Sequence, residues 1–180
     1  MQFPGLLAAV VLAAATLSAS AQTTPPAQPP GAIDFTRWEG RWYEVARLPN
    51  WSQRHCDPEV VATVLRRTNG DISMIHQCRK TDGSWGVALG YGRFEGDPIE
   101  GTLGVRFTPE WLTLPPFARG SFYALALDVD ARYALLGSLN RDHLWILSQT
   151  RTIDESVYQR AVAQAGQLGY DTAGLIRTVK

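Results

Sequence analysis

Few residues of this chain have the type and spacing that chemistry would require. The three histidines, His55, His76 and His143, are far apart, and no His-x₃-His pair or Cys/His cluster accompanies them, so a metal centre is not indicated. The sequence has neither a Gly-x-Ser-x-Gly nucleophile motif nor a phosphate-binding glycine loop. We therefore expect no catalytic residue, no metal and no cofactor.

Two ionisable residues, Glu44 and His76, fall within apolar segments that alternate like β-strands. We expect both to point inward, where a polar group in an apolar pocket commonly orients a ligand. The simpler alternative is that each forms hydrogen bonds only within the protein. A third interpretation makes Glu44 or His76 the base of an enzyme acting on a lipid or isoprenoid, which requires a shifted pKa.

The elements that would position these residues are strands separated by turn signals such as Asn69-Gly70 and Asp82-Gly83. Short connections favour antiparallel neighbours, and closing the sheet removes its two exposed edges. The sequence thus predicts an all-β fold, an eight-stranded up-and-down antiparallel β-barrel. Its eight expected strands are 42–48, 59–65, 72–78, 87–94, 102–107, 121–127, 133–138 and 143–149.

One helix is expected outside the barrel, covering strands that are apolar on both faces. The segment Thr152 to Glu155 matches a capping box, which makes Thr152 the expected N-cap. Gly166 and Gly169 are expected to end the helix, and residues 175–179 to add a short outer strand. The apolar stripe of this helix consists of Ile153, Val157, Ala161, Ala165 and Leu168.

The N-terminal residues are typical of export. Residues 6–17 form an apolar run that is too short to span a membrane, which takes ~20 residues, and a small-x-small cleavage pattern ends at Ala21. We expect a signal peptide over 1–21, a Pro-rich spacer over 22–31 and one domain over 32–180. Because no cysteine follows the apolar run, we expect a soluble periplasmic protein without a lipid anchor, with association with the outer membrane as an alternative.

Charge and cysteine content narrow the function classes further. The 17 basic and 17 acidic residues are dispersed along the chain, with no run of like charge longer than two, so there is no basic stripe to bind nucleic acid. Cys56 and Cys78 are an even pair in a chain with an export signal, which favours a structural disulfide. Two buried free thiols are the alternative.

Three segments together resemble the bacterial lipocalins related to apolipoprotein D: Gly40 to Arg47, Leu127 to Tyr133, and Leu144 to Ser148. The resemblance runs from about residue 34 to 179. It implies that Gly40 makes a tight turn and that Trp42 plugs the closed end. The family's third motif ends in an arginine against that tryptophan, and here the position is Gln149, so we expect the closed end to be held differently, with Arg151 as a candidate.

The resemblance also implies a lumen for small hydrophobic ligands such as fatty acids or lysophospholipids, which the protein would transport or store to maintain envelope lipids without catalysis. The alternative is a barrel filled by its own side chains. By strand alternation and by the resemblance, the expected ligand-binding residues are Glu44, Val60, Val64, Met74, His76, Phe94, Leu103, Val105, Phe107, Phe122, Leu136 and Trp145.

A Pro-rich apolar stretch over 109–117 joins the fifth and sixth expected strands. It can contact a membrane, a partner or its own barrel wall, and a weak homodimer through it is an alternative to a monomer. A rival interpretation, an outer-membrane barrel, requires apolar residues to face outward, whereas the fifth strand is apolar on one face only. The residues expected at the rim or entrance are Trp51, Trp111, Leu112, Leu114 and Phe117.

Overall fold

The computed structural model describes residues 35–95, 102–109 and 121–179. The expected signal peptide and spacer, and Trp111, Leu112, Leu114 and Phe117 of the expected entrance, lie outside the described residues. In chain order the elements are η1 (Phe35–Trp38), β1 (Gly40–Arg47), η2 (Trp51–Gln53), β2 (Cys56–Arg66), β3 (Ile72–Lys80), β4 (Trp85–Glu95), β5 (Thr102–Pro109), β6 (Ser121–Leu127), β7 (Tyr133–Gly137), β8 (Leu144–Ser148), α1 (Glu155–Gln167), η4 (Thr172–Gly174) and β9 (Ile176–Arg177).

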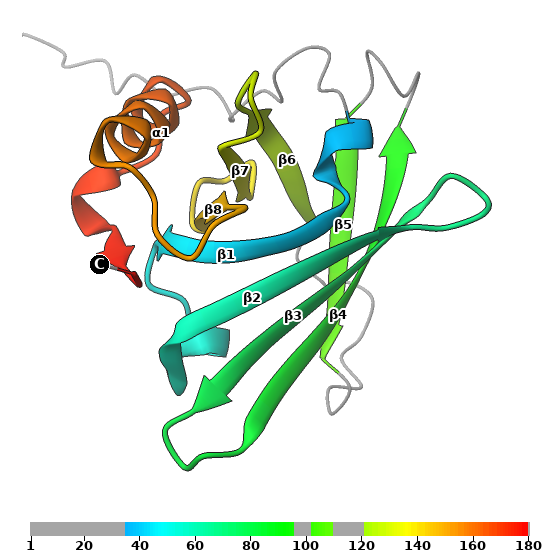
Figure 1. The fold of residues 1–180 in the computed structure, drawn as a ribbon, viewed down its shortest axis with the longest axis horizontal. Helices are drawn as coiled ribbons and strands as arrows, with labels where there is room; N and C mark the ends of the chain where they lie inside the picture. Colours follow the sequence, from blue (N-terminus) through cyan, green and yellow to red (C-terminus); the bar gives the residue numbers. More distant parts are fainter. Residues whose placement is uncertain (1–34, 96–101, 110–120, 180) are drawn as a thin grey trace, which may run out of the picture.

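The strands form a closed antiparallel barrel (Figure 1). Each strand from β2 to β8 pairs with the next, β8 pairs with β1, and β1 pairs with β2 to close the ring. The short strand β9 adds to β1 from outside, and α1 lies beside β7. The predicted eight-stranded barrel with an outer helix is confirmed. The strand bounds differ at the ends: β2, for example, begins at Cys56 rather than at residue 59.

Apolar side chains form two layers, one on each side of the strands β6, β7 and β8. The outer layer joins these strands to α1 through Val157, Ala161 and Ala165, as the apolar stripe of the helix predicts. An apolar interior is the reverse of the pattern that an outer-membrane barrel requires. The buried residues of the interior, named here the inner cluster, are Trp38, Trp42, Ala62, Val64, Ile72, Met74, Leu103, Val105, Ala124, Ala131, Ala134, Leu136, Trp145 and Leu147.

The start of α1 corrects the prediction of a capping box at Thr152. The N-cap is Asp154, whose carboxylate accepts from the backbone N–H of Ser156 at 2.8 Å. Glu155 does not reach back to Thr152 and instead accepts from Gln159 and Arg177. Asp ranks above Thr as an N-cap, which explains the later start.

The C-terminal end of α1 differs from the prediction at one of its two glycines. Gly169, with φ +86°, follows the C-cap as expected, because only a residue without Cβ adopts this conformation at low cost. Gly166, by contrast, lies inside the helix rather than ending it.

Trp38 and Trp42 fill the end of the barrel that η1 covers, which we call the closed end. Their ring centroids are 5.8 Å apart, and Trp42 Nε1 donates to the main-chain oxygen of Trp38 at 2.8 Å. Gly40 enters β1 with φ +113°, which suits glycine. Arg37 donates to the main-chain oxygen of Val129, which ties η1 to the β6–β7 turn.

Gln149, which replaces the family's arginine, is exposed. Arg151 is also on the outside, where it lies 5.3 Å from the ring centroid of Tyr43 and pairs with Glu59. The ring contact recorded for Trp42 is with Trp38. Neither Gln149 nor Arg151 therefore takes over the stacking role at the closed end.

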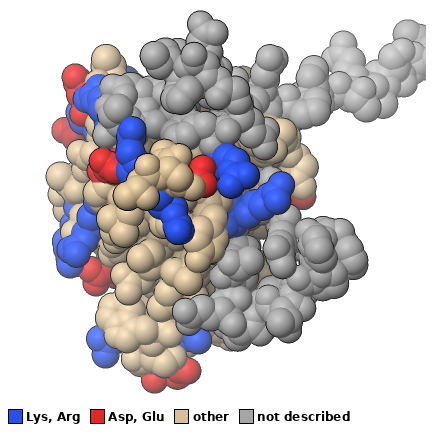
Figure 2. Space-filling model, turned by 90° about the vertical axis from the view of Figure 1, so that its right-hand side faces the viewer, with Lys and Arg blue, Asp and Glu red and all other residues tan. Residues whose placement is uncertain are grey.

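Cys56 and Cys78 form the predicted disulfide, with Cα atoms 5.5 Å apart. Cys78 lies opposite Val60, in a register that is unbroken from the pair of Arg66 and Ile72, and β2 becomes irregular only between Val60 and Cys56. Within the described ranges, no helix is long and apolar enough to cross a membrane. Charges of both signs are interspersed over the described part of the face in Figure 2.

Candidate functional site: a polar network and an aromatic cluster at the rim of the lumen

The site lies at the end of the barrel opposite η1, which we call the rim, where the β1–β2 loop and the β7–β8 turn are found. A bulge in β1 between Glu44 and Ala46 shifts the strand register against β8. Glu44 therefore pairs with Leu147 and Arg47 with Trp145, both residues of the inner cluster. Without the bulge, side chains three residues apart would point to opposite faces.

Four buried side chains form a hydrogen-bonded network at this end. Arg47 Nη1 donates to Glu44 Oε1 at 2.5 Å, and Gln53 Nε2 donates to Glu44 Oε2 at 2.7 Å. Trp145 Nε1 donates to Gln53 Oε1 at 2.7 Å. Each of the four is at most 8% exposed. We call Glu44, Arg47, Gln53 and Trp145 the rim network.

Gln53 also fixes the loop that carries it. Asn50 caps η2 by accepting from the backbone N–H of Gln53 at 3.0 Å, and its amide donates to Gln53 Oε1 at 2.7 Å. One side chain thus connects the β1–β2 loop to Glu44 on β1 and to Trp145 on β8. The loop is held over the rim by polar contacts rather than by apolar packing alone.

Burial dominates the acid–base behaviour of Glu44. Loss of solvent raises the pKa of its carboxyl group, while the charge and hydrogen bond of Arg47 and the hydrogen bond of Gln53 oppose the rise. A buried ion pair repays the cost of desolvation only in part. Any further hydrogen-bond donor that reaches the carboxylate would therefore stabilise its ionised form.

Aromatic rings surround Trp145 on the lumen side of the network. The ring centroid of Trp145 lies 5.0 Å from that of Phe122, 5.9 Å from that of His143 and 6.3 Å from that of His76. Burial lowers the pKa of His76 to about 4, so its imidazole is neutral at pH 7. These four residues, the aromatic cluster, present a largely apolar surface below the polar network.

Most of the predicted ligand-binding residues meet in the interior. Val64, Met74, Leu103, Val105, Leu136 and Trp145 belong to the inner cluster, and the partly buried Phe122 packs against it. Val60 is buried but lines a pocket between β1 and β2. The main chains of Phe94 and Phe107 lie in β4 and β5, and their side chains are outside the described set. Of the predicted entrance, Trp51 is 63% exposed, with the Arg54 guanidinium 4.3 Å from its ring centroid.

Sequence patterns alone did not indicate Arg47, Gln53 and His143 as residues of this site. Strict alternation from Glu44 directs Arg47 outward, and only the bulge turns it inward. Gln53 lies in a loop, where no periodicity applies. His143 was set aside as one of three scattered histidines, yet it stacks on Trp145. Arg47 is one of three charged residues of β1, with Arg41 and Glu44, so its charge alone gave no signal.

Within the described residues, no group of three or more His, Cys, Asp or Glu side chains could hold a metal ion. The chemistry that remains at the rim is binding by hydrogen bonds and aromatic contacts, or proton exchange at Glu44 and His76. Both uses are compatible with an apolar barrel interior that ends in a polar network.

Comparisons with known proteins agree with this architecture. Residues 33–180 match the family model for the lipocalin-like domain. The chain is 34% identical over 173 residues to the outer membrane lipoprotein Blc of Escherichia coli K12, covering 94% of this chain and 93% of that protein. It is 32% identical over 149 residues to temperature-induced lipocalin-1 of Arabidopsis thaliana, covering 81% and 78% of the two chains.

Solved structures share the fold at low sequence identity. Lobster apocrustacyanin A1 superimposes with a TM-score of 0.60 at 17% identity, covering 81% of this chain and 78% of that one. A major cockroach allergen gives a TM-score of 0.61 at 16% identity, covering 86% and 93%. The family-model match and the relatives above 30% identity decide the assignment: this chain belongs to the lipocalin-like domain family.

Proposed function

We propose that this protein binds a small hydrophobic ligand, such as a fatty acid or a lysophospholipid, inside the barrel, and that it transports or stores the ligand without chemical change. One observation carries the proposal: an interior of buried apolar side chains that ends at the rim network. This arrangement suits an amphiphile, whose tail would contact residues such as Met74 and Leu136 while its head group meets Glu44 and Arg47.

Transfer of the tail from water supplies the affinity. Each buried CH₂ group contributes about 0.8 kcal/mol, so a fourteen-carbon tail contributes about 10 kcal/mol before the costs of association. That is sufficient for micromolar binding, which needs about 8 kcal/mol. The rim network then adds selectivity, since its charged and hydrogen-bonding side chains favour a polar head group over an apolar one at that end of the barrel.

The first test is to extract the purified protein with organic solvent and to identify the extracted molecules by mass spectrometry. Delipidated protein is then titrated with a fourteen-carbon fatty acid while tryptophan emission is recorded. Saturable quenching is expected, and Trp145→Ala should weaken it. Absence of both an extracted lipid and saturable quenching would contradict the proposal.

A matched pair of variants locates the ligand. Ala124 is buried in the inner cluster, and Ala163 is exposed on α1. Ala124→Trp should fill the lumen and abolish fatty-acid binding, whereas Ala163→Trp should bind as the natural chain does. Circular dichroism checks folding, and Ala124→Leu serves as a smaller step if the tryptophan does not fit. Unchanged affinity in a folded Ala124→Trp protein would place the ligand elsewhere.

The same proposal assigns the protein to the periplasm, exported by residues 1–21. Bacterial relatives named outer membrane lipoproteins support an envelope location. Both cysteines of the chain are joined in the disulfide, which supports a form without an acylated cysteine. Cell fractionation and N-terminal sequencing of the mature protein test this, with Gln22 as the expected first residue.

Peripheral contact with a membrane and weak dimerisation are further parts of the proposal. The exposed Trp51 beside Arg54 at the rim supports the first, because tryptophan and arginine suit the lipid interface. Co-sedimentation with vesicles tests membrane contact, and analytical ultracentrifugation at high concentration tests the dimer. Trp51→Ser should reduce vesicle binding if the rim contacts lipid.

An enzyme acting on a lipid or isoprenoid is the second candidate. It is favoured by two ionisable groups with shifted pKa values in the interior, a raised one for Glu44 and a value of about 4 for His76, since such shifts gather at functional sites. Turnover that depends on pH and disappears in His76→Ala would support it. Recovery of every extracted lipid unchanged after prolonged incubation would exclude it for those lipids.

A further inference from the structure

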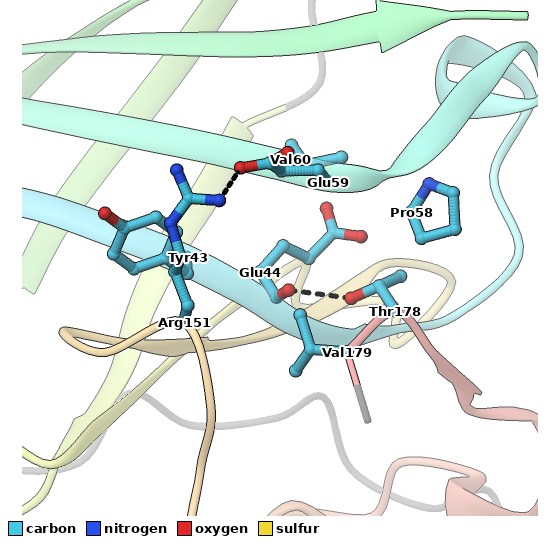
Figure 3. A pocket seen from close by; sticks show the side chains of 8 residues that line it. All are labelled: Tyr43, Glu44, Pro58, Glu59, Val60, Arg151, Thr178 and Val179. Carbon is cyan, nitrogen blue, oxygen red and sulfur yellow. Dashed lines mark hydrogen bonds and ion pairs between the residues drawn. The ribbon is translucent and has the colours of Figure 1, made fainter.

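A pocket of about 190 Å³ lies where β1 and β2 separate. The two strands pair only from Gly40 to Tyr43 with Val61 to Val64. Beyond Tyr43, β1 forms hydrogen bonds with the C-terminal segment instead of with β2. The strand β9 pairs with Ala46 and Arg47, and the backbone N–H of Thr178 donates to Val45 O at 3.0 Å. The barrel wall therefore has a gap between β1 and the first residues of β2, and we call the space in it the side pocket (Figure 3).

The carboxyl group of Glu44 lies at the bottom of the side pocket. Figure 3 shows it directed into the space between Glu59 and Pro58. Glu44 is only 1% exposed, so the side pocket ends at a carboxylate that solvent barely reaches. The side chains of Val60 and Val179 form the aliphatic part of the pocket wall.

Opposite charges stand at the mouth of the pocket. Arg151 pairs with Glu59, and its guanidinium lies over the ring of Tyr43. The lining side chains comprise two carboxylates and one guanidinium, while Arg47, the counter-charge of Glu44, does not line the pocket. The groups that a ligand would meet in the pocket therefore favour a cation over an anion. Both partners of the mouth pair are largely exposed, so the pair can separate at little cost to admit a ligand.

Two groups on the floor retain the capacity to accept hydrogen bonds. A carboxylate offers about four acceptor positions, and within the described residues Glu44 uses one on each oxygen, for Arg47 and for Gln53. Thr178 Oγ1 donates its proton to the main-chain oxygen of Glu44 at 2.7 Å, so its lone pairs can accept. A ligand that donates more than one N–H from a single positive centre matches this arrangement.

Size limits the ligand to a short molecule. The volume of 190 Å³ corresponds to that of on the order of six water molecules in the liquid, too little for a lipid tail. We propose that the side pocket binds a small primary ammonium compound of the size of ethanolamine, with its –NH₃⁺ group on Glu44 and Thr178. Binding would lower the raised pKa of Glu44, because a second cation stabilises the ionised carboxylate.

This site shares the Glu44 carboxylate with the lumen ligand of the proposed function, but it lies in the gap of the barrel wall, and Thr178 belongs to the side pocket alone. The test is to titrate the ¹⁵N-labelled mature chain with ethanolamine at pH 7 and to follow the backbone amides by NMR. Saturable shifts are expected at Glu44, Val60 and Thr178. Ethylene glycol, which has a similar size and no charge, should produce no saturable shift at these amides. Equal shifts with both compounds, or no saturable shift with ethanolamine, would overturn the proposal.

Three variants decide which groups hold the ligand. Glu44→Gln keeps the shape of the side chain and should weaken ethanolamine binding at least tenfold. Thr178→Val removes the acceptor oxygen at nearly constant volume and should weaken binding severalfold, and it decides the matter if Glu44→Gln does not fold. Asp130→Asn, a change of exposed carboxylate to amide in the β6–β7 turn, is the matched control and should bind as the natural chain does. Natural affinity in a folded Glu44→Gln or Thr178→Val protein would refute the assignment.

If the natural chain binds fatty acid but not ethanolamine, the side-pocket proposal is refuted and the lumen proposal stands. The reverse result, ethanolamine binding in a protein that takes up no lipid, would leave the side pocket standing and refute the lumen proposal. Titration in the presence of 150 mM and 500 mM NaCl separates ammonium recognition from general cation binding: shifts that sodium reproduces at the same amides would refute recognition of the ammonium group.

Discussion

Arg47 Nη1 lies 2.5 Å from Glu44 Oε1, and both side chains are buried on the same face of β1 although they are three residues apart. The bulge between Glu44 and Ala46 makes this possible. A buried charge that loses its partner is costly, while replacing both members by apolar residues often is not.

The ion pair gives the first prediction. Arg47→Leu should lower the free energy of unfolding by about 3 to 5 kcal/mol, since it leaves the Glu44 carboxylate buried without its counter-charge. The double variant Glu44→Leu/Arg47→Leu should cost less than Arg47→Leu alone. Urea denaturation of both variants measures the difference. The surface pair of Arg93 and Asp71, in which the arginine side chain is 80% exposed, is the control, where Arg93→Leu should cost less than about 1 kcal/mol.

A second prediction concerns His76 and pH. The folded protein holds the pKa of His76 at about 4, against 6.5 for the free side chain. Between these values the unfolded chain binds more protons than the folded one, so stability falls as pH falls from 6.5 to 4, by about 3 kcal/mol from this group. Above pH 6.5 its contribution is constant.

The variant His76→Gln isolates that contribution. Glu44 acts in the opposite direction, because its raised pKa makes the folded state bind a proton more readily than the unfolded one, and this part of the stability is lost as pH rises through the folded pKa. Subtracting the pH profile of His76→Gln from that of the natural chain removes the Glu44 contribution. A flat difference between pH 7 and 4 would show that the imidazole is not held neutral.

Gln53 provides a third prediction, on dynamics. Gln53→Ala removes the side-chain hydrogen bonds of Gln53 with Glu44, Trp145 and Asn50. It should lower the free energy of unfolding by about 1 to 3 kcal/mol. Amide hydrogen exchange at residues 50–55 should become faster, and lipid should dissociate more quickly from the lumen. Ser52→Ala, a change at an exposed residue of the same 3₁₀ turn, should leave lipid dissociation unchanged. Equal dissociation rates for the natural chain and Gln53→Ala would mean that the loop does not control release.

The disulfide gives a fourth prediction. Cys56 and Cys78 are separated by 22 residues, and in the chain-entropy model a loop of this length contributes about 3 kcal/mol. The double variant Cys56→Ser/Cys78→Ser should lose about that amount in denaturant titrations. Adding a thiol reductant should destabilise the natural chain by a similar amount and leave the double variant unaffected. No effect of the reductant on the natural chain would argue against the bond.

Much of this fold could be predicted from the sequence, because the signals are local. The alternation along β8 correctly directs Trp145 and Leu147 inward and Leu144 and Ile146 outward. The two cysteines in a chain with export features predicted the disulfide. The apolar stripe of α1 predicted which of its faces is buried.

The remaining features depend on events that strand periodicity does not encode. A bulge adds a residue without changing the apolar content of a strand, so the inward turn of Arg47 on β1 and the shift between Ala124 and Ala126 on β6 could not be read from alternation. Gln53 acquires its role only when the loop folds over Trp145. The choice of Asp154 over Thr152 as N-cap depends on which of two nearby polar residues reaches a free amide.

The pairing of β9 with β1 has a practical consequence for recombinant protein. Thr178 is two residues from Lys180 and hydrogen bonds to the backbone of Glu44 and Val45. An affinity tag fused directly after Lys180 would therefore start beside the barrel wall, within reach of the residues that bound the lumen. A cleavable affinity tag at the amino terminus, or a carboxyl-terminal tag that follows a long spacer, keeps binding measurements free of this interference.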